Sequence, residues 1–251
     1  METFNIALPT GWPELTDEQL LMVYGLLARD LSTAEVKSLC LMKWNHIKVL
    51  ATLPRHRFLI KRGKEQVVLR ARQIQQATSV LDFLDSFAPM PIRIARIGKH
   101  RALPADFEKV PFEQYLYVDN LFQGYLNTQQ DELLHQMAQV LYASNHVKPS
   151  KAHLVGIFYW MASLKQYFAS LFSNFYKPAP AKGDGNLLGN SQPDIYSQLR
   201  DTTNAMIRAL TGGDITKESR ILKMDTWRAL TELDAKAREA EELRRLTHHK
   251  K

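Results

Sequence analysis

The side chains that could do chemistry are spread singly along the chain. His135 lies on a predicted helix, with no histidine four residues further on and no cysteine to complete a metal site. Asp82 and Asp85 share one face of another predicted helix, where two carboxylates can act as acid and base, although such pairs far more often form a solvated helix face. Cys40, the only cysteine, falls on an apolar helix face, which is typical of a buried and unreactive thiol.

No catalytic, metal or cofactor site is predicted from these residues. The sequence contains no His-Glu-x-x-His, no cysteine pair and no nucleophile elbow. The glycine-rich stretch GDGNLLG (183–189) does not follow a predicted strand and lacks the Lys-Ser/Thr ending of a phosphate loop. We therefore expect a protein that is not an enzyme and binds no cofactor. An enzyme of unrecognised type would need a deep polar pocket that holds carboxylates with shifted pKa values.

Positive charge is concentrated in one stretch of the chain. Residues 61–110 contain 10 basic and 5 acidic side chains, so they carry +5 of the formal net charge of +7. A clustered basic face can attract nucleic acid, anionic lipid or an acidic protein, because it neutralises charge and releases counterions. The alternative is a solvated face that only keeps the protein in solution. The candidate basic patch comprises Lys61, Arg62, Lys64, Arg70, Arg93, Arg96, Lys99 and Arg101.

The composition is that of an ordinary soluble globular protein. Of the 251 residues, 45% are apolar and 24% are charged. One cysteine cannot form an internal disulfide, and the opening residues METFNIALPTGW contain neither a basic nor an apolar leader segment, so we expect an intracellular protein. The most apolar run (154–164) has eleven residues, too few for a bilayer span of roughly twenty. No membrane span is therefore predicted.

The elements that must position these side chains begin with two helices. Thr16 with Gln19, and Ser32 with Glu35, have the spacing of capping boxes. Apolar residues at helical spacing extend the second of these helices to residue 50. The two helices are expected to form an α-hairpin.

A small β-element is predicted next. The runs 57–61 and 66–70 alternate as strands do and flank a turn at Gly63, which indicates a hairpin. A helix should follow at about 74–84, and a third short alternating segment at 92–96. The basic patch would then project from strand faces and turns.

Helical spacing returns after this element. Pro111 suits the first turn of a helix, Thr128 and Asp131 are expected to start the next one, and Ser150 to cap a third that runs to about residue 172. Residues 177–192 are rich in Pro, Gly and Asn and predict a flexible linker. Two further helices follow, the first ended by Gly212-Gly213 and the second starting near residue 225.

The predicted fold is therefore mainly α (α+β). It is a helical bundle with a small β-hairpin or three-strand element near residues 57–97 and a C-terminal helical arm. We divide the chain into a mainly helical globular domain at 1–176 with the basic β-element (about 57–101) inserted, a linker at 177–192, and a C-terminal helical region at 193–251.

Two of the predicted helices carry candidate partner-binding residues. The helix at 150–172 is apolar on all sides, which favours a central place in its own core but also fits a surface that meets another chain. The last helix has a narrow apolar stripe, suited to pairing with one other helix or another subunit, or else to loose packing on its own domain. The candidate anchors are Trp160, Phe168, Phe172, Trp227 and Leu230.

Five sequence segments together resemble a known family. In chain order they are GWPELTDEQL, PFEQYLYVDNLFQGYL, LLHQMAQVLYAS, FYWMASLKQYFASLF and TWRALTELDAKAREAEEL. They resemble an uncharacterised family in prophages and phage-like elements of Bacteroidetes bacteria, found alongside tail-morphogenesis genes. The resemblance covers most of the chain outside the linker, and it implies no catalytic residue.

The resemblance implies a non-catalytic role in particle assembly, such as a tail assembly chaperone or a head–tail component. Its place would be the cytoplasm of the bacterial host or the virion. Other particle or tail proteins would be its partners, and a homo-oligomer stays open. The alternative from the residues alone is a nucleic-acid-associated protein that uses the basic stretch 57–101.

Overall fold

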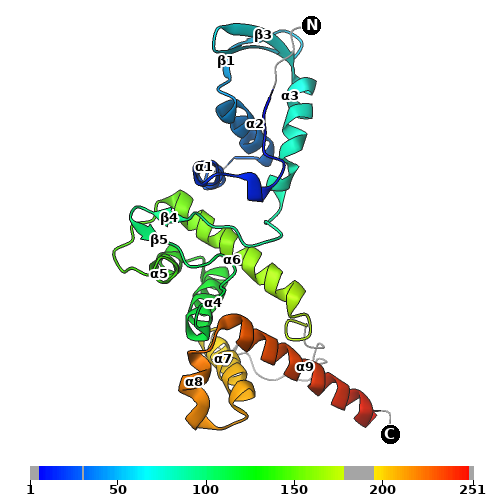
Figure 1. The fold of residues 1–251 in the computed structure, drawn as a ribbon. Coiled ribbons are helices and arrows are strands. Elements are labelled where there is room, and N and C mark those ends of the chain that lie inside the picture. The colour runs from blue at the N-terminus through cyan, green and yellow to red at the C-terminus, as the bar shows by residue number, and fades with distance from the viewer. Residues whose placement is uncertain (1–5, 30, 178–194, 249–251) are drawn as a thin grey trace, which may run out of the picture.

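The structure is a computed structural model that describes residues 6–29, 31–177 and 195–248. Figure 1 shows an elongated molecule, with the three-stranded sheet and α1–α3 at one end, α4–α6 in the middle and α7–α9 at the other end. The prediction of a mainly α fold with a small β-element is confirmed. The main elements are α1 (Asp17–Leu27), α2 (Thr33–Trp44), β1 (Lys48–Leu53), β2 (Arg57–Arg62), β3 (Glu65–Arg70), α3 (Ala71–Thr78), β4 (Arg96–Ile97), β5 (His100–Arg101), α4 (Phe112–Thr128), α5 (Asp131–Leu141), α6 (Lys151–Leu171), α7 (Ile195–Thr211), α8 (Glu218–Leu222) and α9 (Thr226–His248).

Both predicted capping boxes are present. The Thr16 hydroxyl accepts from the Gln19 backbone N–H at 3.2 Å, and the Gln19 side chain accepts from the Thr16 N–H in return. Ser32 and Glu35 repeat the arrangement at the start of α2. These reciprocal bonds satisfy donors that a helix N-terminus otherwise leaves unpaired, which is why spacing alone located both starts.

The β-element differs from the prediction in its third strand. β1, β2 and β3 form an antiparallel sheet in that order, so the predicted hairpin is confirmed, but the third strand precedes it instead of following it. Helix α2 was expected to reach residue 50, but it ends at Trp44. Two residues later, His46 adopts a left-handed conformation (φ 55°). The segment 92–96 is also not a strand of this sheet. Only β4 forms there, and it pairs with β5.

Two hydrophobic clusters hold the helices. The first gathers α1, α2 and the 3-10 helix Ser79–Asp85 around Trp12, Tyr24 and Leu81, with Ala152 and Tyr159 of α6 packed against it. The second contains α4, α5 and α6 together with Ile221, Ala229, Leu230 and Leu233. The C-terminal helices thus contribute to the same core as α4–α6. Helix α6 touches both clusters and connects the two ends of the molecule.

The middle and C-terminal helices begin and end largely as expected. Ser150 caps α6 with a full capping box, α7 ends before Gly212 and Gly213, which both have positive φ, and α9 begins at Thr226. The predicted start at Thr128 is wrong. Thr128 closes α4 by donating its hydroxyl to the Gly124 carbonyl, and α5 begins at Asp131.

The predicted linker at 177–192 lies outside the described residues apart from Lys177. Across the described ranges, every helix is too short or too polar to cross a lipid bilayer.

Candidate functional site

The predicted partner anchors lie in the protein's own core. Trp160 is 1% exposed, Phe168 and Leu230 are 0% exposed and Phe172 is 6% exposed, so these four side chains are not available to a partner. Trp227 is half-buried and packs edge-on against Phe168 and Phe172, with ring centroids 5.7 Å and 5.9 Å apart. The partner-binding role predicted for Trp160, Phe168, Phe172 and Leu230 is therefore wrong, and the core interpretation of the aromatic helix is correct. The role predicted for Trp227 stays a prediction.

The indole N–H groups of Trp160 and Trp227 both have backbone acceptors. Trp160 Nε1 donates to the Ala105 carbonyl at 2.6 Å, and Trp227 Nε1 donates to the Asp106 carbonyl at 2.8 Å. A buried indole needs an acceptor, and here the loop before α4 supplies both. The aromatic residues of α6 and α9 thus fix that loop.

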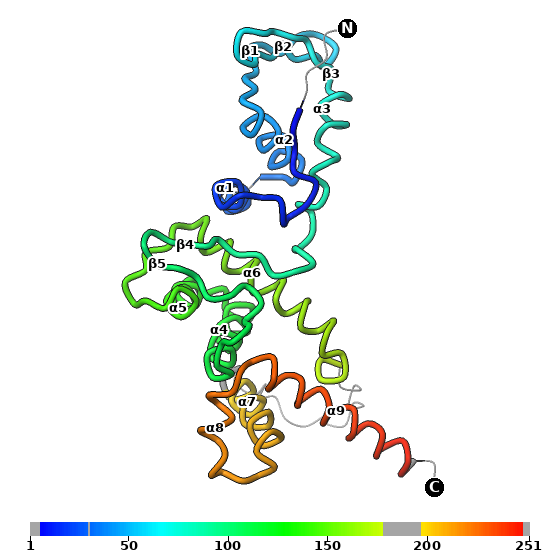
Figure 2. Tube along the Cα trace, in the orientation of Figure 1, coloured from blue at the N-terminus to red at the C-terminus, as the bar shows by residue number. Residues whose placement is uncertain are grey.

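The predicted basic patch is divided between two places. Lys61, Arg62, Lys64 and Arg70 belong to the three-stranded sheet or its turn, whereas Arg96, Lys99 and Arg101 belong to the β4–β5 hairpin. Figure 2 shows this hairpin beside α5 and α6, apart from the sheet at the end of the molecule. Arg93 has a structural role, since its Nε donates to the Leu103 carbonyl. The eight residues therefore do not form one surface.

One face of the three-stranded sheet gathers two residues of the predicted basic patch and two basic residues outside it. Lys48 lies directly opposite Lys61, and Arg57 lies directly opposite Arg70. Because side chains alternate along a strand and paired residues share a face, all four project from the same side, which we call the outer face. Ile60, on the other side, is 1% exposed, whereas the four basic residues are exposed. Arg62 lies on the side of Ile60.

The outer face combines charge with an apolar centre. Leu59 and Val68 are paired between the two rows of cations, and Val68 is 43% exposed. Within residues 6–29, 31–177 and 195–248, no carboxylate forms an ion pair with Lys48, Arg57, Lys61 or Arg70. Like charges placed directly opposite one another destabilise a sheet. An anion bound across this face would remove that repulsion.

Lys48 and Arg57 were not among the predicted site residues. Their contribution to the outer face depends on which residues pair across the strands. Lys48 also lies in the segment that helical spacing assigns to a helix. The run KVLATL is so short that its apolar residues fit both the helical period and the strand period.

The other residues considered for chemistry have structural roles. Lys37 of α2 donates to Asp82 at 2.6 Å and to Asp85 at 2.5 Å, so this carboxylate pair holds α2 to the 3-10 helix that follows α3. The spacing of Asp82 and Asp85 suggested a solvated helix face, but the pair also binds Lys37. Cys40 is buried as predicted, and burial raises the pKa of its thiol to about 12.

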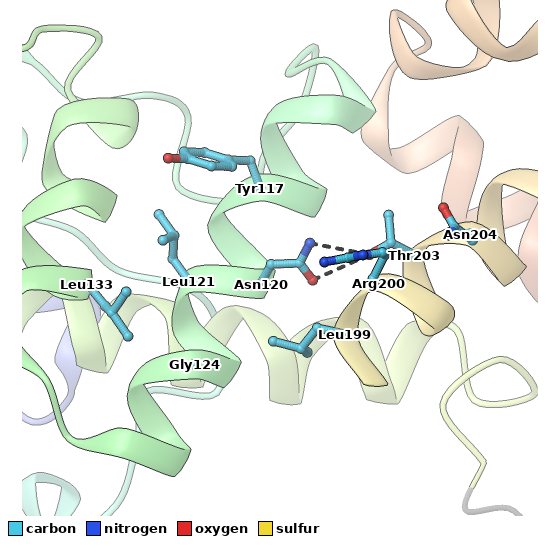
Figure 3. A pocket seen from close by; sticks show the side chains of 9 residues that line it. All are labelled: Tyr117, Asn120, Leu121, Gly124, Leu133, Leu199, Arg200, Thr203 and Asn204. Carbon is cyan, nitrogen blue, oxygen red and sulfur yellow. Dashed lines mark hydrogen bonds between the residues drawn. The ribbon is translucent and has the colours of Figure 1, made fainter. Parts of the chain in front are cut away.

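A pocket of about 330 Å³ lies between α4 and α7. Figure 3 shows the side chains that line it. The Asn120 amide donates to the Thr203 hydroxyl at 3.2 Å and links the two helices. Tyr117 and Leu121 line one side and Leu199 the other. Arg200 is the only charged residue of the lining, so no acid and base converge there.

In the part of the chain that the structure describes, no three His, Cys, Asp or Glu side chains come close enough to hold a metal ion. The chain matches no protein-family model, no curated protein and no solved structure, so the resemblance to prophage proteins stays a prediction that depends on the sequence segments alone.

Proposed function

We propose that this protein is a non-catalytic nucleic-acid-binding protein and that the outer face of its sheet makes the contact. The observation that carries the proposal is the pair of like-charged rows, Lys48 with Lys61 and Arg57 with Arg70, exposed on one face without carboxylate partners among the described residues. A polyanion would neutralise both rows at once and release counterions.

The spacing of the rows suits a duplex. Arg57 and Lys61 are four residues apart on β2, which places the two rows about 13 Å apart at roughly 3.3 Å per residue. The major groove of B-DNA is about 12 Å wide, so the rows can reach phosphates on its two sides. The outer face carries no aromatic side chain on which bases could stack, because Phe58 lies on the other side. We therefore expect phosphate contacts that do not depend on sequence.

Fluorescence anisotropy with a labelled DNA duplex tests the proposal. Four phosphate contacts predict that log K falls with log salt at a slope of about −3 to −4. The double variant Lys61→Glu/Arg70→Glu should weaken binding by about tenfold or more at roughly 50 mM salt, because it reverses one charge in each row. Both residues are exposed, so the fold should tolerate the change.

Lys99→Glu/Arg101→Glu is the matched control, since it makes the same charge change on the separate β4–β5 hairpin. It should reduce affinity much less than the sheet variant does. Equal losses would indicate attraction by net charge alone, and no binding at low salt would refute the proposal.

We also propose, as a second candidate, the role in particle assembly that the sequence resemblance implies. The buried aromatic anchors do not support this role, but another observation does. Leu243 and Leu246, in the part of α9 that extends away from the other helices, are 64% and 63% exposed. Exposed leucines three residues apart on one helix suit pairing with a helix of another particle protein.

A further inference from the structure

A second cavity, of about 580 Å³, opens between α4, the end of α6, α7 and α9. Cavities of this size can hold a small organic molecule. Apolar side chains make up much of its wall, among them Phe175, Met206 and Leu233. Four polar side chains from α4, α6 and the residues after α6 meet at one side of it, namely Tyr115, Asp119, Lys165 and Tyr176.

The polar side chains form two coupled pairs. Lys165 Nζ lies 2.8 Å from Asp119 Oδ1, and the two side chains are only 22% and 14% exposed. The hydroxyls of Tyr115 and Tyr176 are 2.6 Å apart. Lys165 Nζ also lies 5.1 Å from the centre of the Tyr176 ring. These contacts place an ammonium group and two phenols beside one another.

Their protonation states leave hydrogen-bond donors unused. Burial by itself would lower the pKa of Lys165, but the charge and hydrogen bond of Asp119 and the interaction with Tyr176 together outweigh it. The net pKa is raised, so the ammonium stays charged. Burial raises the pKa of both Tyr115 and Tyr176, so both hydroxyls keep their protons. One hydroxyl donates to the other, which leaves one O–H free. The Asp119 contact occupies at most one of the three N–H groups of Lys165.

The cavity also carries an excess of positive charge. Three lysines line it, and two of them face carboxylates, because Lys165 pairs with Asp119 and Lys177 lies 3.5 Å from Glu241. Lys236 is the third, and it forms no ion pair within the described part of the chain. The unused donors and this charge both call for an anionic oxygen acceptor.

We propose that this cavity binds a small amphipathic carboxylate. The carboxylate would accept hydrogen bonds from Lys165 and from the free tyrosine hydroxyl, with Lys236 balancing its charge. The apolar body would lie against Phe175, Met206 and Leu233. This site is independent of the outer face of the sheet, so either proposal can fail without the other.

The proposal can be tested by displacing 1-anilinonaphthalene-8-sulfonate from the full chain while its fluorescence is recorded. Two competitors of equal carbon number are compared, decanoate and decanol. Decanoate should displace the probe at a concentration about tenfold or more below that needed for decanol, because only decanoate carries the anionic acceptor. Decanoate should also raise Tm.

Three variants in the cavity and one control outside it locate the site. Ala209→Phe on α7 should fill the cavity and abolish decanoate binding, whereas Asn204→Phe, which lines the pocket of Figure 3 instead, should leave it unchanged. Lys236→Met, at an exposed position, should remove the preference for decanoate over decanol. Tyr176→Phe should weaken decanoate without unfolding the protein.

Two outcomes would overturn the proposal, and the first of them does not depend on any variant. Equal binding of decanoate and decanol by the wild-type protein would overturn the proposal. So would decanoate binding that survives both Ala209→Phe and Lys236→Met, because the ligand would then lie elsewhere.

Discussion

Single side chains set how this fold responds to pH, and His153 is the clearest case. Its Nδ1 accepts from the Ser150 backbone N–H at 3.1 Å and completes the capping box at the start of α6. Burial lowers the pKa of His153 below its usual 6.5. The unfolded chain therefore takes up a proton first as the pH falls, and stability that is present above pH 6.5 is lost below it.

His153→Gln should remove this loss between about pH 7 and pH 5, because Gln is a natural partner in a capping box and does not titrate. Urea unfolding at several pH values measures the difference. His135→Gln on α5 serves as the control, since that residue caps no helix. A wild-type pH dependence that persists in His153→Gln would contradict the assignment.

Buried phenols and the thiol predict a second limit at high pH. Burial raises the pKa values of Tyr24, Tyr115, Tyr142 and Cys40 above their ordinary values of 10.0 for tyrosine and 9.0 for cysteine. The unfolded chain loses these protons first, so stability should fall as the pH rises above about 9 to 10. Tyrosinate absorbance should rise together with loss of helical circular dichroism. Gradual ionisation near pH 10 with the helices intact would show that these tyrosines are accessible.

At the scale of elements, the contact between α1 and α6 depends on one glycine. A Cβ at Gly156 would lie 2.8 Å from the Tyr24 ring, which is itself 1% exposed and cannot move aside. Gly156→Ala should therefore destabilise the protein by about 1–3 kcal/mol in urea unfolding, despite the better helix propensity of alanine.

Gly25→Ala is the matched control on the other helix of this contact. Its Cβ would lie 3.6 Å from that of Ala152, an ordinary distance, so propensity should dominate and stability should rise by up to about 1 kcal/mol. Destabilisation of similar size in both variants would mean that the two helices are closer along their whole length than Gly156 indicates.

The elements also show which parts of the fold can be predicted from sequence. The starts of α1, α2 and α6 follow from a side chain and a backbone N–H three residues apart, and such local signals were correct. Strand β1 and the outer face depend on the pairing of Lys48 with Lys61, which no local window contains. The polar cavity likewise joins α4 to α6 and α9, so its residues carried no signal in sequence.

At the scale of the whole molecule, the candidate surfaces lie at separate places. The basic sheet stands at one end and the exposed part of α9 extends from the other (Figure 1). Helix α6, which packs into both hydrophobic clusters, ties the two ends together. Under the two proposals, nucleic acid would bind at one end of the molecule and a protein partner at the other.

The assembly proposal predicts that the exposed end of α9 is needed for complex formation and not for folding. Leu243→Lys/Leu246→Lys should leave the helical circular dichroism and Tm unchanged, because both leucines are largely exposed. In size-exclusion light scattering, the wild-type chain co-expressed with products of neighbouring genes should form a complex, and the variant should elute as the 28.9 kDa monomer. Ile215→Lys, at another apolar residue that is 79% exposed, should keep the complex. A wild-type chain that stays monomeric with every neighbouring product would leave α9 as a solvated arm and refute a role in assembly.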